Sequence, residues 1–140
     1  MKLTSKGRYA VIAMLDIAIK QAEGPITLSM VSERQGISLS YLEQIFAKLK
    51  KNGLVLSARG PGGGYRLSRL ADDISISDII GAVNESLDPR KCAGKENCKH
   101  GDACLSHDLW HELSKTIANF LTGVSLQQVI DKKYEIKGIL

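Results

Sequence analysis

The chain has 140 residues, 44% of them hydrophobic and 24% charged, which is typical of one soluble globular domain with an appendage and excludes two large independent domains. Residues 1–70 carry a net charge of +7, from 11 basic and 4 acidic residues, whereas residues 71–140 carry −3, from 8 and 11. This asymmetry favours a polyanion, most simply DNA, as the partner of the first half.

The pattern of apolar residues and turn signals predicts a mainly helical chain with one β-hairpin. The expected elements are helices over about 5–22, 27–34 and 39–51, strands over 54–58 and 65–68, and helices over 75–83, 103–121 and 125–132. Gly24-Pro25 ends the first helix, Gly36 turns the chain after the second, and Gly53 terminates the third. Helix, helix, turn, helix and hairpin is the order of a winged helix-turn-helix unit, so we expect a mainly α fold with a small β-hairpin wing and a long helix behind it.

The third predicted helix separates an apolar face from a polar one. On a helical wheel its apolar residues Leu42, Ile45, Phe46 and Leu49 share one face, and Ser40, Tyr41, Glu43, Gln44, Ala47, Lys48 and Lys51 lie across the opposite arc. Gln44 can bond bidentately to adenine, and Glu43 can accept from the cytosine amine. A solvated polar face is the alternative, but the helix before it and the hairpin after it favour a base-reading role.

The hairpin and the basic residues supply the other expected DNA contacts. Arg59 begins a glycine-rich tip over residues 59–64, where it can enter a minor groove while the glycines allow close backbone approach. A plain flexible tip is the alternative, and a P-loop is excluded because no Gly-Lys-Ser/Thr follows. Further expected contacts are Ser38 at the start of the third helix and the side chains of Lys2, Lys6, Arg8, Lys48, Lys51 and Arg66.

Three cysteines and a histidine lie close together in the sequence, as Cys92, Cys98, Cys104 and His107. An odd number of clustered cysteines is typical of ligand thiolates in a reducing compartment rather than of disulfides. Cys104 and His107 are expected on one face of the long helix, with the other two cysteines on the loop before it. The spacing leaves the metal open, because three thiolates and an imidazole suit either zinc or an iron-sulfur cluster. His111 is a second candidate for the fourth ligand, and His100 is expected to be a loop residue.

Five sets of residues carry a resemblance to a known family: residues 3–10 (LTSKGRYA), 33–38 (ERQGIS), 40–44 (SYLEQ), 59–65 (RGPGGGY), and the set of Cys92, Cys98, Cys104 and His107. Through them the chain closely resembles the IscR family of bacterial iron-sulfur cluster regulators, which are winged-helix transcription factors. The resemblance covers nearly the whole chain. It implies a homodimer joined through the long helix, a [2Fe-2S] cluster on those three cysteines and His107, and cluster assembly proteins as cluster donors.

The resemblance also implies a regulator rather than an enzyme. It implies repression of iron-sulfur assembly genes when the cluster is bound, with other promoters bound with or without the cluster. We expect palindromic operators, and we expect that ordering of the loop by the cluster changes how Glu43 meets the bases. A winged-helix regulator with a structural Cys3His zinc site is the alternative.

These expectations divide the chain into three parts. They are a winged helix-turn-helix DNA-binding domain over 1–85, a cluster-binding loop over 86–108, and a dimerisation helix with a C-terminal helix over 103–140. No apolar stretch approaches the roughly 20 residues that cross a bilayer, so we expect a cytoplasmic protein without a membrane partner.

Overall fold

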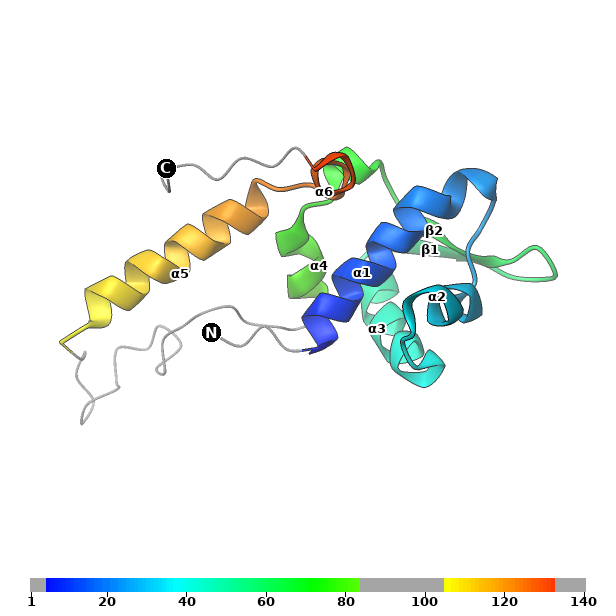
Figure 1. Ribbon diagram of the computed structural model, residues 1–140, viewed down its shortest axis with the longest axis horizontal. Coiled ribbons are helices and arrows are strands. Elements are labelled where there is room, and N and C mark those ends of the chain that lie inside the picture. The colour runs from blue at the N-terminus through cyan, green and yellow to red at the C-terminus, as the bar shows by residue number, and fades with distance from the viewer. Residues whose placement is uncertain (1–4, 84–104, 133–140) are drawn as a thin grey trace.

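The computed structural model describes residues 5–83 and 105–132, and Figure 1 shows the order of their elements. The elements are α1 (Ser5–Lys20), the 3-10 turn η1 (Gln21–Glu23), α2 (Leu28–Gln35), α3 (Leu39–Lys51), β1 (Val55–Ala58), β2 (Gly64–Leu67), the 3-10 turn η2 (Ala71–Asp73), α4 (Ile76–Ala82), α5 (His107–Thr122) and α6 (Leu126–Asp131). The two strands pair antiparallel, from Val55 opposite Leu67 to Ala58 opposite Gly64. The predicted mainly α fold with a hairpin wing is confirmed.

Local side chains fix where the helices begin and end. The Thr27 hydroxyl accepts a hydrogen bond from the Met30 amide at 3.2 Å and caps α2. Gly36 closes α2 in the left-handed conformation, with φ of +67°, which a residue without Cβ adopts at little cost. Ser38 then caps α3 through the Tyr41 amide at 3.4 Å. The sharp turn between α2 and α3 therefore follows from three local sequence signals.

The core forms where α1 packs against α2, α3, α4 and α6. The four apolar residues predicted for the inner face of α3, Leu42, Ile45, Phe46 and Leu49, are each at most 1% exposed. The apolar spacing of α1 also predicts Tyr9, Ala13 and Ile17 on its inner face. Ala13 and Ile17 are buried there, but Tyr9 is 37% exposed and lies outside the core. Its ring packs edge-on against Tyr41 instead, which gives the large side chain a partner at the surface.

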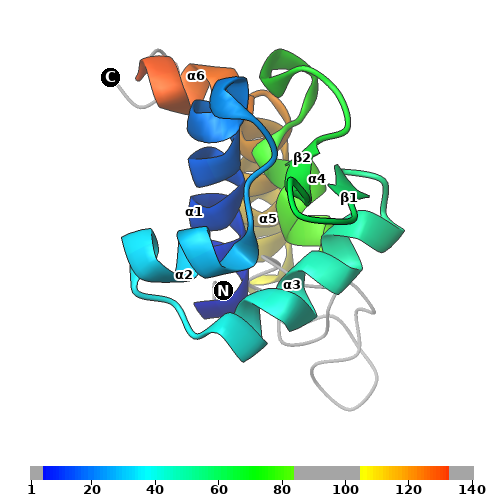
Figure 2. The same ribbon diagram turned by 90° about the vertical axis from the view of Figure 1, so that its right-hand side faces the viewer.

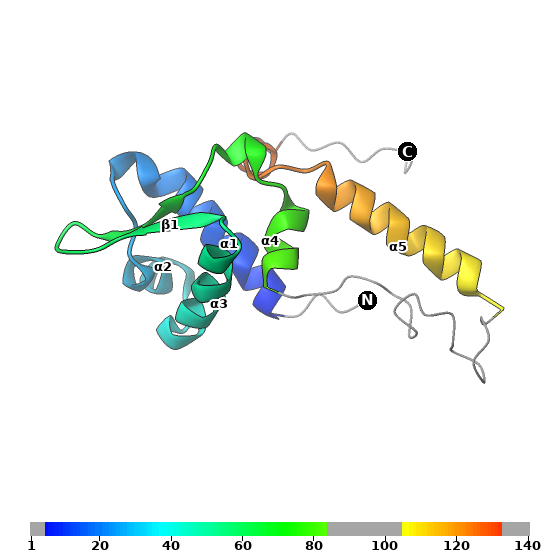
Figure 3. The ribbon, with the colours of Figure 1, turned by 180° about the vertical axis from the view of Figure 1, so that it is seen from behind.

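The last helices differ in how they meet this core. Val124 and Leu126, at the start of α6, are buried, and α6 packs against α1 and η2. By contrast, no residue of α5 is buried, and the helix extends away from the domain in Figures 1 and 3. Within the described ranges, no helix has both the length and the apolar character needed to cross a bilayer. The long predicted helix is therefore a protruding element, joined to the core at its C-terminal end.

The first turn of α5 corrects one expectation. The helix was expected from about residue 103, but Leu105 and Ser106 form a turn and the helix begins at His107. Leu105 is fully exposed, so no burial draws it into the helix. Cys104 lies outside the described residues, so the expectation that Cys104 and His107 share one helical face stays a prediction.

Candidate nucleic-acid interface

One end of the molecule presents α2, α3 and the wing together, with α5 behind them, as Figure 2 shows. On α3, Ser40, Glu43 and Gln44 are exposed. Among the described residues, no hydrogen bond or ion pair holds the side chain of Glu43 or Gln44, whereas the Ser40 hydroxyl lies 3.0 Å from that of Ser38. The outer face of α3 therefore has polar groups available to meet base edges in a major groove.

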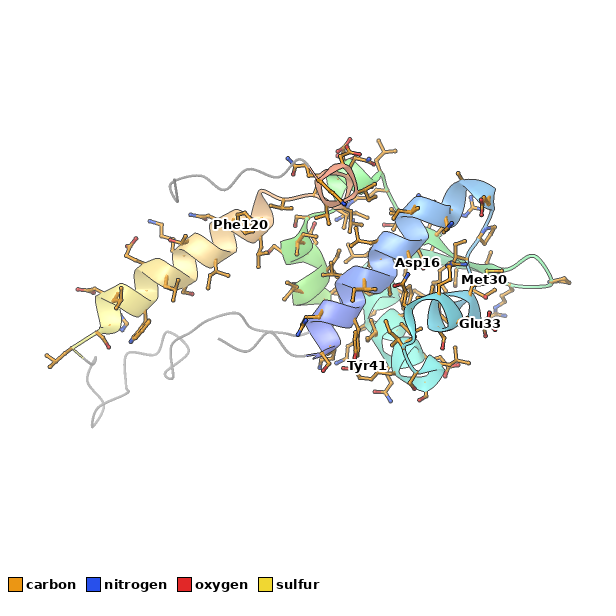
Figure 4. The ribbon with its side chains drawn as sticks, in the orientation of Figure 1. Asp16, Met30, Glu33, Tyr41 and Phe120 are labelled. Carbon is orange, nitrogen blue, oxygen red and sulfur yellow. The ribbon has the colours of Figure 1, made fainter. Side chains whose placement is uncertain are left out.

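Two basic residues meet beside this helix. The Lys48 ammonium on α3 lies close to the Lys6 ammonium on α1, and this close approach of two like charges lowers the pKa of Lys48. Two ammonium groups held together attract a phosphate, which relieves their repulsion. Figure 4 shows Tyr41 at the same junction, where its ring centroid lies 5.8 Å from that of Tyr9 in an edge-on contact. The start of α1 and the outer edge of α3 thus form one positively charged surface.

The wing is fixed to the domain by three backbone amides. Ile26 forms an isolated antiparallel bridge with Tyr65 of β2, with N to O distances of 2.9 and 2.7 Å. The Gln21 side chain accepts a hydrogen bond from the Leu67 amide at 2.9 Å. The Tyr65 ring also packs on Phe46 of α3, with centroids 5.0 Å apart. These contacts set the position of the wing relative to the reading helix.

Glycines are required where the wing approaches other backbone. A Cβ on Gly64, whose φ is +147°, would lie 2.7 Å from the Ile26 backbone, and one on Gly63 would lie 2.3 Å from the Ala58 carbonyl. Gly62 has open space instead. Arg59 is exposed at the base of this tip, where the sequence placed it. The glycine-rich tip is therefore a turn with close backbone contacts at Gly63 and Gly64, which favours this reading over the alternative of a plain flexible loop.

A buried carboxylate fixes α2 against α1. Asp16, labelled in Figure 4, accepts hydrogen bonds from Arg34 at 2.6 and 3.0 Å and from Gln35 at 2.8 Å. Its side chain is only 2% exposed. Burial raises the pKa of Asp16, but the hydrogen bonds from Arg34 and Gln35 outweigh it, and the pKa lies below its ordinary value. The carboxylate therefore stays charged and holds α2, the helix that precedes the reading helix α3, in place.

The remaining basic residues predicted as DNA contacts lie at the surface where the structure describes them. Arg8, Lys51 and Arg66 are exposed, and Lys2 lies outside the described residues. Sequence reasoning missed Gln21 and Ile26, because a helix end and a loop residue carry no signal of pairing with a later strand. Asp16 did carry a signal, since a charge on the apolar face of a helix needs a buried partner.

The predicted cluster ligands are only partly described. Cys92, Cys98 and Cys104 lie outside the described residues, and within residues 5–83 and 105–132 no group of three or more His, Cys, Asp or Glu could hold a metal ion. His107 is half-buried at the first position of α5 and His111 is exposed, with the two rings stacked at a centroid distance of 6.2 Å. Both imidazoles thus occupy one side of the first turns of α5.

Comparison with known proteins gives a consistent result. A family model named Rrf2, described as an iron-dependent transcriptional regulator, matches residues 3–132. The chain is 58% identical over 139 residues to the HTH-type transcriptional regulator IscR of Xenorhabdus nematophila. This match covers 99% of this chain and 84% of that relative. It is similar to the solved structure of T. potens IscR, with a TM-score of 0.77, 38% identity, and coverage of 94% and 88% of the two chains. It is also similar to CymR, the global cysteine regulator of B. subtilis, with a TM-score of 0.82, 29% identity, and coverage of 94% and 98%.

Proposed function

Because the chain belongs to the Rrf2 family of iron-dependent transcriptional regulators, we propose that it senses an iron-sulfur cluster and reads operator DNA with α3 and the wing. It is a winged-helix transcriptional regulator. We assign it no catalytic reaction and place it in the cytoplasm, where its DNA partner lies. The observation that carries the DNA-reading role is the exposed face of Glu43 and Gln44 beside the paired amines of Lys6 and Lys48.

On DNA, α3 lies in the major groove and the wing reaches the adjacent minor groove. Ser40, Glu43 and Gln44 face base edges, and Tyr41 packs at the backbone beside them. Arg59 enters the minor groove, where negative potential is strongest when the groove is narrow. The cations that contact phosphates are Lys2, Lys6, Arg8, Lys48, Lys51 and Arg66, and they make binding strongly dependent on salt.

The sensing group we propose is a [2Fe-2S] cluster held by Cys92, Cys98, Cys104 and His107. Soft thiolates with one imidazole suit this cluster chemically, and the half-buried position of His107 is better shielded than that of the exposed His111. The family's iron dependence favours the cluster over a structural zinc site. When bound, the cluster supplies a group that iron, oxygen or cluster demand can remove. Cluster assembly proteins are its donors.

The proposed working form is a homodimer joined through α5. The helix exposes Leu109 (60%), Trp110, Leu113 and Phe120 (37% each) on one face, and Ile117 lies half-buried among them. An apolar stripe of this length on a protruding helix is typical of a surface that pairs with a second copy. Two copies then present two α3 helices to a palindromic operator. The loaded dimer represses iron-sulfur assembly genes, and other promoters are bound with or without the cluster.

Anaerobic purification tests this function directly. We expect coloured protein with visible absorption bands and with iron and sulfide in equal amounts. The loaded protein should bind DNA with a different operator preference from protein stripped by a chelator. His107→Ala should lose the colour, whereas His111→Ala should keep it. Colourless protein with stoichiometric zinc, or identical operator preferences for the two forms, would contradict the proposal.

A further inference from the structure

The side chain of Asn52 forms a hydrogen-bonded link between the last turn of α3 and α4. Asn52, the residue after α3, donates from Nδ2 to the Lys48 carbonyl at 2.8 Å and to the Ala82 carbonyl at 3.3 Å. A primary amide carries two N–H groups, so one nitrogen can serve both acceptors at once. Ala82 is the final residue of α4, where carbonyls lack intrahelical partners. Asn52 thus joins the ends of two helices that lie 30 positions apart in the sequence.

The other end of α4 is tied to the segment that follows α5. The Ile76 amide donates to the Val124 carbonyl at 2.9 Å, and the Leu126 amide donates to the Ile74 carbonyl at 2.9 Å. Ser75 and Ser125 form an antiparallel bridge between these bonds. Because α4 is a short helix with a buried inner face, a shift at its first residue carries to its last.

Figures 1 and 3 show α4 standing between α5 and α3, and α4 contacts both. Helix α5 begins at His107, the proposed cluster ligand. On α3, the Asn52 amide reaches the carbonyl of Lys48, whose side chain lies beside Lys6 at the proposed DNA-facing surface. A connected route thus runs from α5 along the chain to Val124, through backbone hydrogen bonds to α4, and through Asn52 to α3.

Resting on the proposed function, we infer that Asn52 is a positioning residue that couples the state of the cluster to the reading helix. With the amide in place, a displacement of α4 moves the Lys48 carbonyl and the last turn of α3. Without the amide, only the packing contacts between α3 and α4 can carry that displacement. Asn52 therefore affects DNA binding chiefly through the difference between the loaded and cluster-free proteins.

Asn52→Ala tests this inference in the full chain. The probe is a labelled duplex selected from a random pool by the loaded wild-type protein, and the readout is the ratio of its dissociation constants for cluster-free and loaded protein. Losing a hydrogen bond of typical net strength should lower that ratio about fivefold. Asn52→Asp, which has the same shape but no N–H donor, should lower the ratio too, although its charge weakens both absolute affinities.

Gln127→Ala is the matched control, because its amide makes one exposed hydrogen bond to Asp131 on α6, at 3.0 Å, and should leave the ratio unchanged. Thermal unfolding and visible absorption verify that each variant is folded and loaded. If the wild-type ratio differs from one and neither Asn52 variant changes it, the inference fails while the proposed function stands. If the wild-type ratio is one, the proposed sensing function fails and the coupling role fails with it.

Discussion

At the scale of single residues, the most consequential side chain outside the DNA-facing surface is Asp16. Its carboxylate is almost fully buried, yet it stays charged because Arg34 binds both oxygens and Gln35 adds a third hydrogen bond. Removing one partner of a buried ion pair leaves the other poorly compensated. Since the Asp16 carboxylate holds α2 against α1, we expect its removal to lower stability more than it changes base reading.

Asp16→Asn should lower the free energy of unfolding by about 2 kcal/mol at neutral pH, the scale of a hydrogen bond to a charged group. The pKa of Asp16 is lowered in the folded state, so its contribution is complete above the unfolded pKa and is lost as pH falls through the folded one. The difference between wild type and variant should therefore shrink below about pH 3.9. Urea unfolding followed by circular dichroism measures it. Asp72→Asn, on exposed η2, is the control, and a pH-independent difference would contradict this role.

At the same scale, we propose that the carboxylate of Glu43 determines operator choice. It is exposed on α3 with no partner among the described residues, so on an operator that offers it no donor it must give up hydration without compensation. Glu43→Ala should tighten binding of the cluster-free protein, by roughly 10- to 100-fold, to operators that wild type binds only when loaded. Fluorescence anisotropy with stripped protein measures the effect. Glu33→Ala, which removes an exposed carboxylate from α2, controls for net charge. Unchanged cluster-free binding would refute the idea.

The sequence alone predicts local features of single residues, but not the partners of long-range hydrogen bonds. The inner face of α3 followed from the spacing of Leu42 and its neighbours, because burial repeats with the helical period. The caps at Thr27 and Ser38 followed from hydroxyls placed before apolar runs. The partners of Gln21 and Asn52 did not, because both bonds join residues 30 or more positions apart. Whether Cys92 and His107 hold one cluster remains a prediction.

At the scale of elements, the wing depends on close backbone packing. Its returning strand is paired with β1 on one side and with Ile26 on the other, so the hairpin cannot pivot freely about its base. This pairing leaves no space for a side chain at Gly64. A rigid wing places Arg59 at a fixed distance from α3, which suits simultaneous binding in adjacent grooves.

Gly64→Ala should destabilise the fold by about 2–4 kcal/mol, because its Cβ meets the Ile26 backbone and its positive φ is unfavourable for alanine. DNA affinity should fall as well, since the pairing of Ile26 with Tyr65 would be broken. Gly62→Ala is the matched control in the same loop, where open space surrounds the added methyl group. Thermal unfolding and DNA titration of both variants check this. Equal tolerance of the two substitutions would show that the approach of Gly64 to Ile26 is not needed.

At the scale of the whole molecule, the proposed DNA-reading surface and the proposed pairing surface lie at opposite ends. Figure 1 shows α5 leading away from α3 and the wing, and Figure 2 shows the reading end facing the viewer with α5 behind it. Because α6 returns to pack against α1, α5 is connected to the domain at its C-terminal end through Val124. That arrangement lets a paired α5 fix the separation of two reading surfaces. Through these contacts α6 shares the core formed by α1 and η2, while the division into residues 1–85, 86–108 and 103–140 stays a prediction.

Leu113→Glu tests the pairing surface, because it places a charge in the middle of the exposed apolar stripe of α5. Burying that charge between two copies should weaken the dimer by about 3 kcal/mol, roughly a hundredfold in its dissociation constant. Ala118→Glu adds the same charge at an exposed position on the opposite face of α5 and should leave the dimer intact. Analytical ultracentrifugation measures the oligomeric state.

Binding to a palindromic duplex should weaken in Leu113→Glu, while binding to a single half-site should not, because each copy retains its own α3 and wing. A dimer unaffected by Leu113→Glu would place the interface elsewhere.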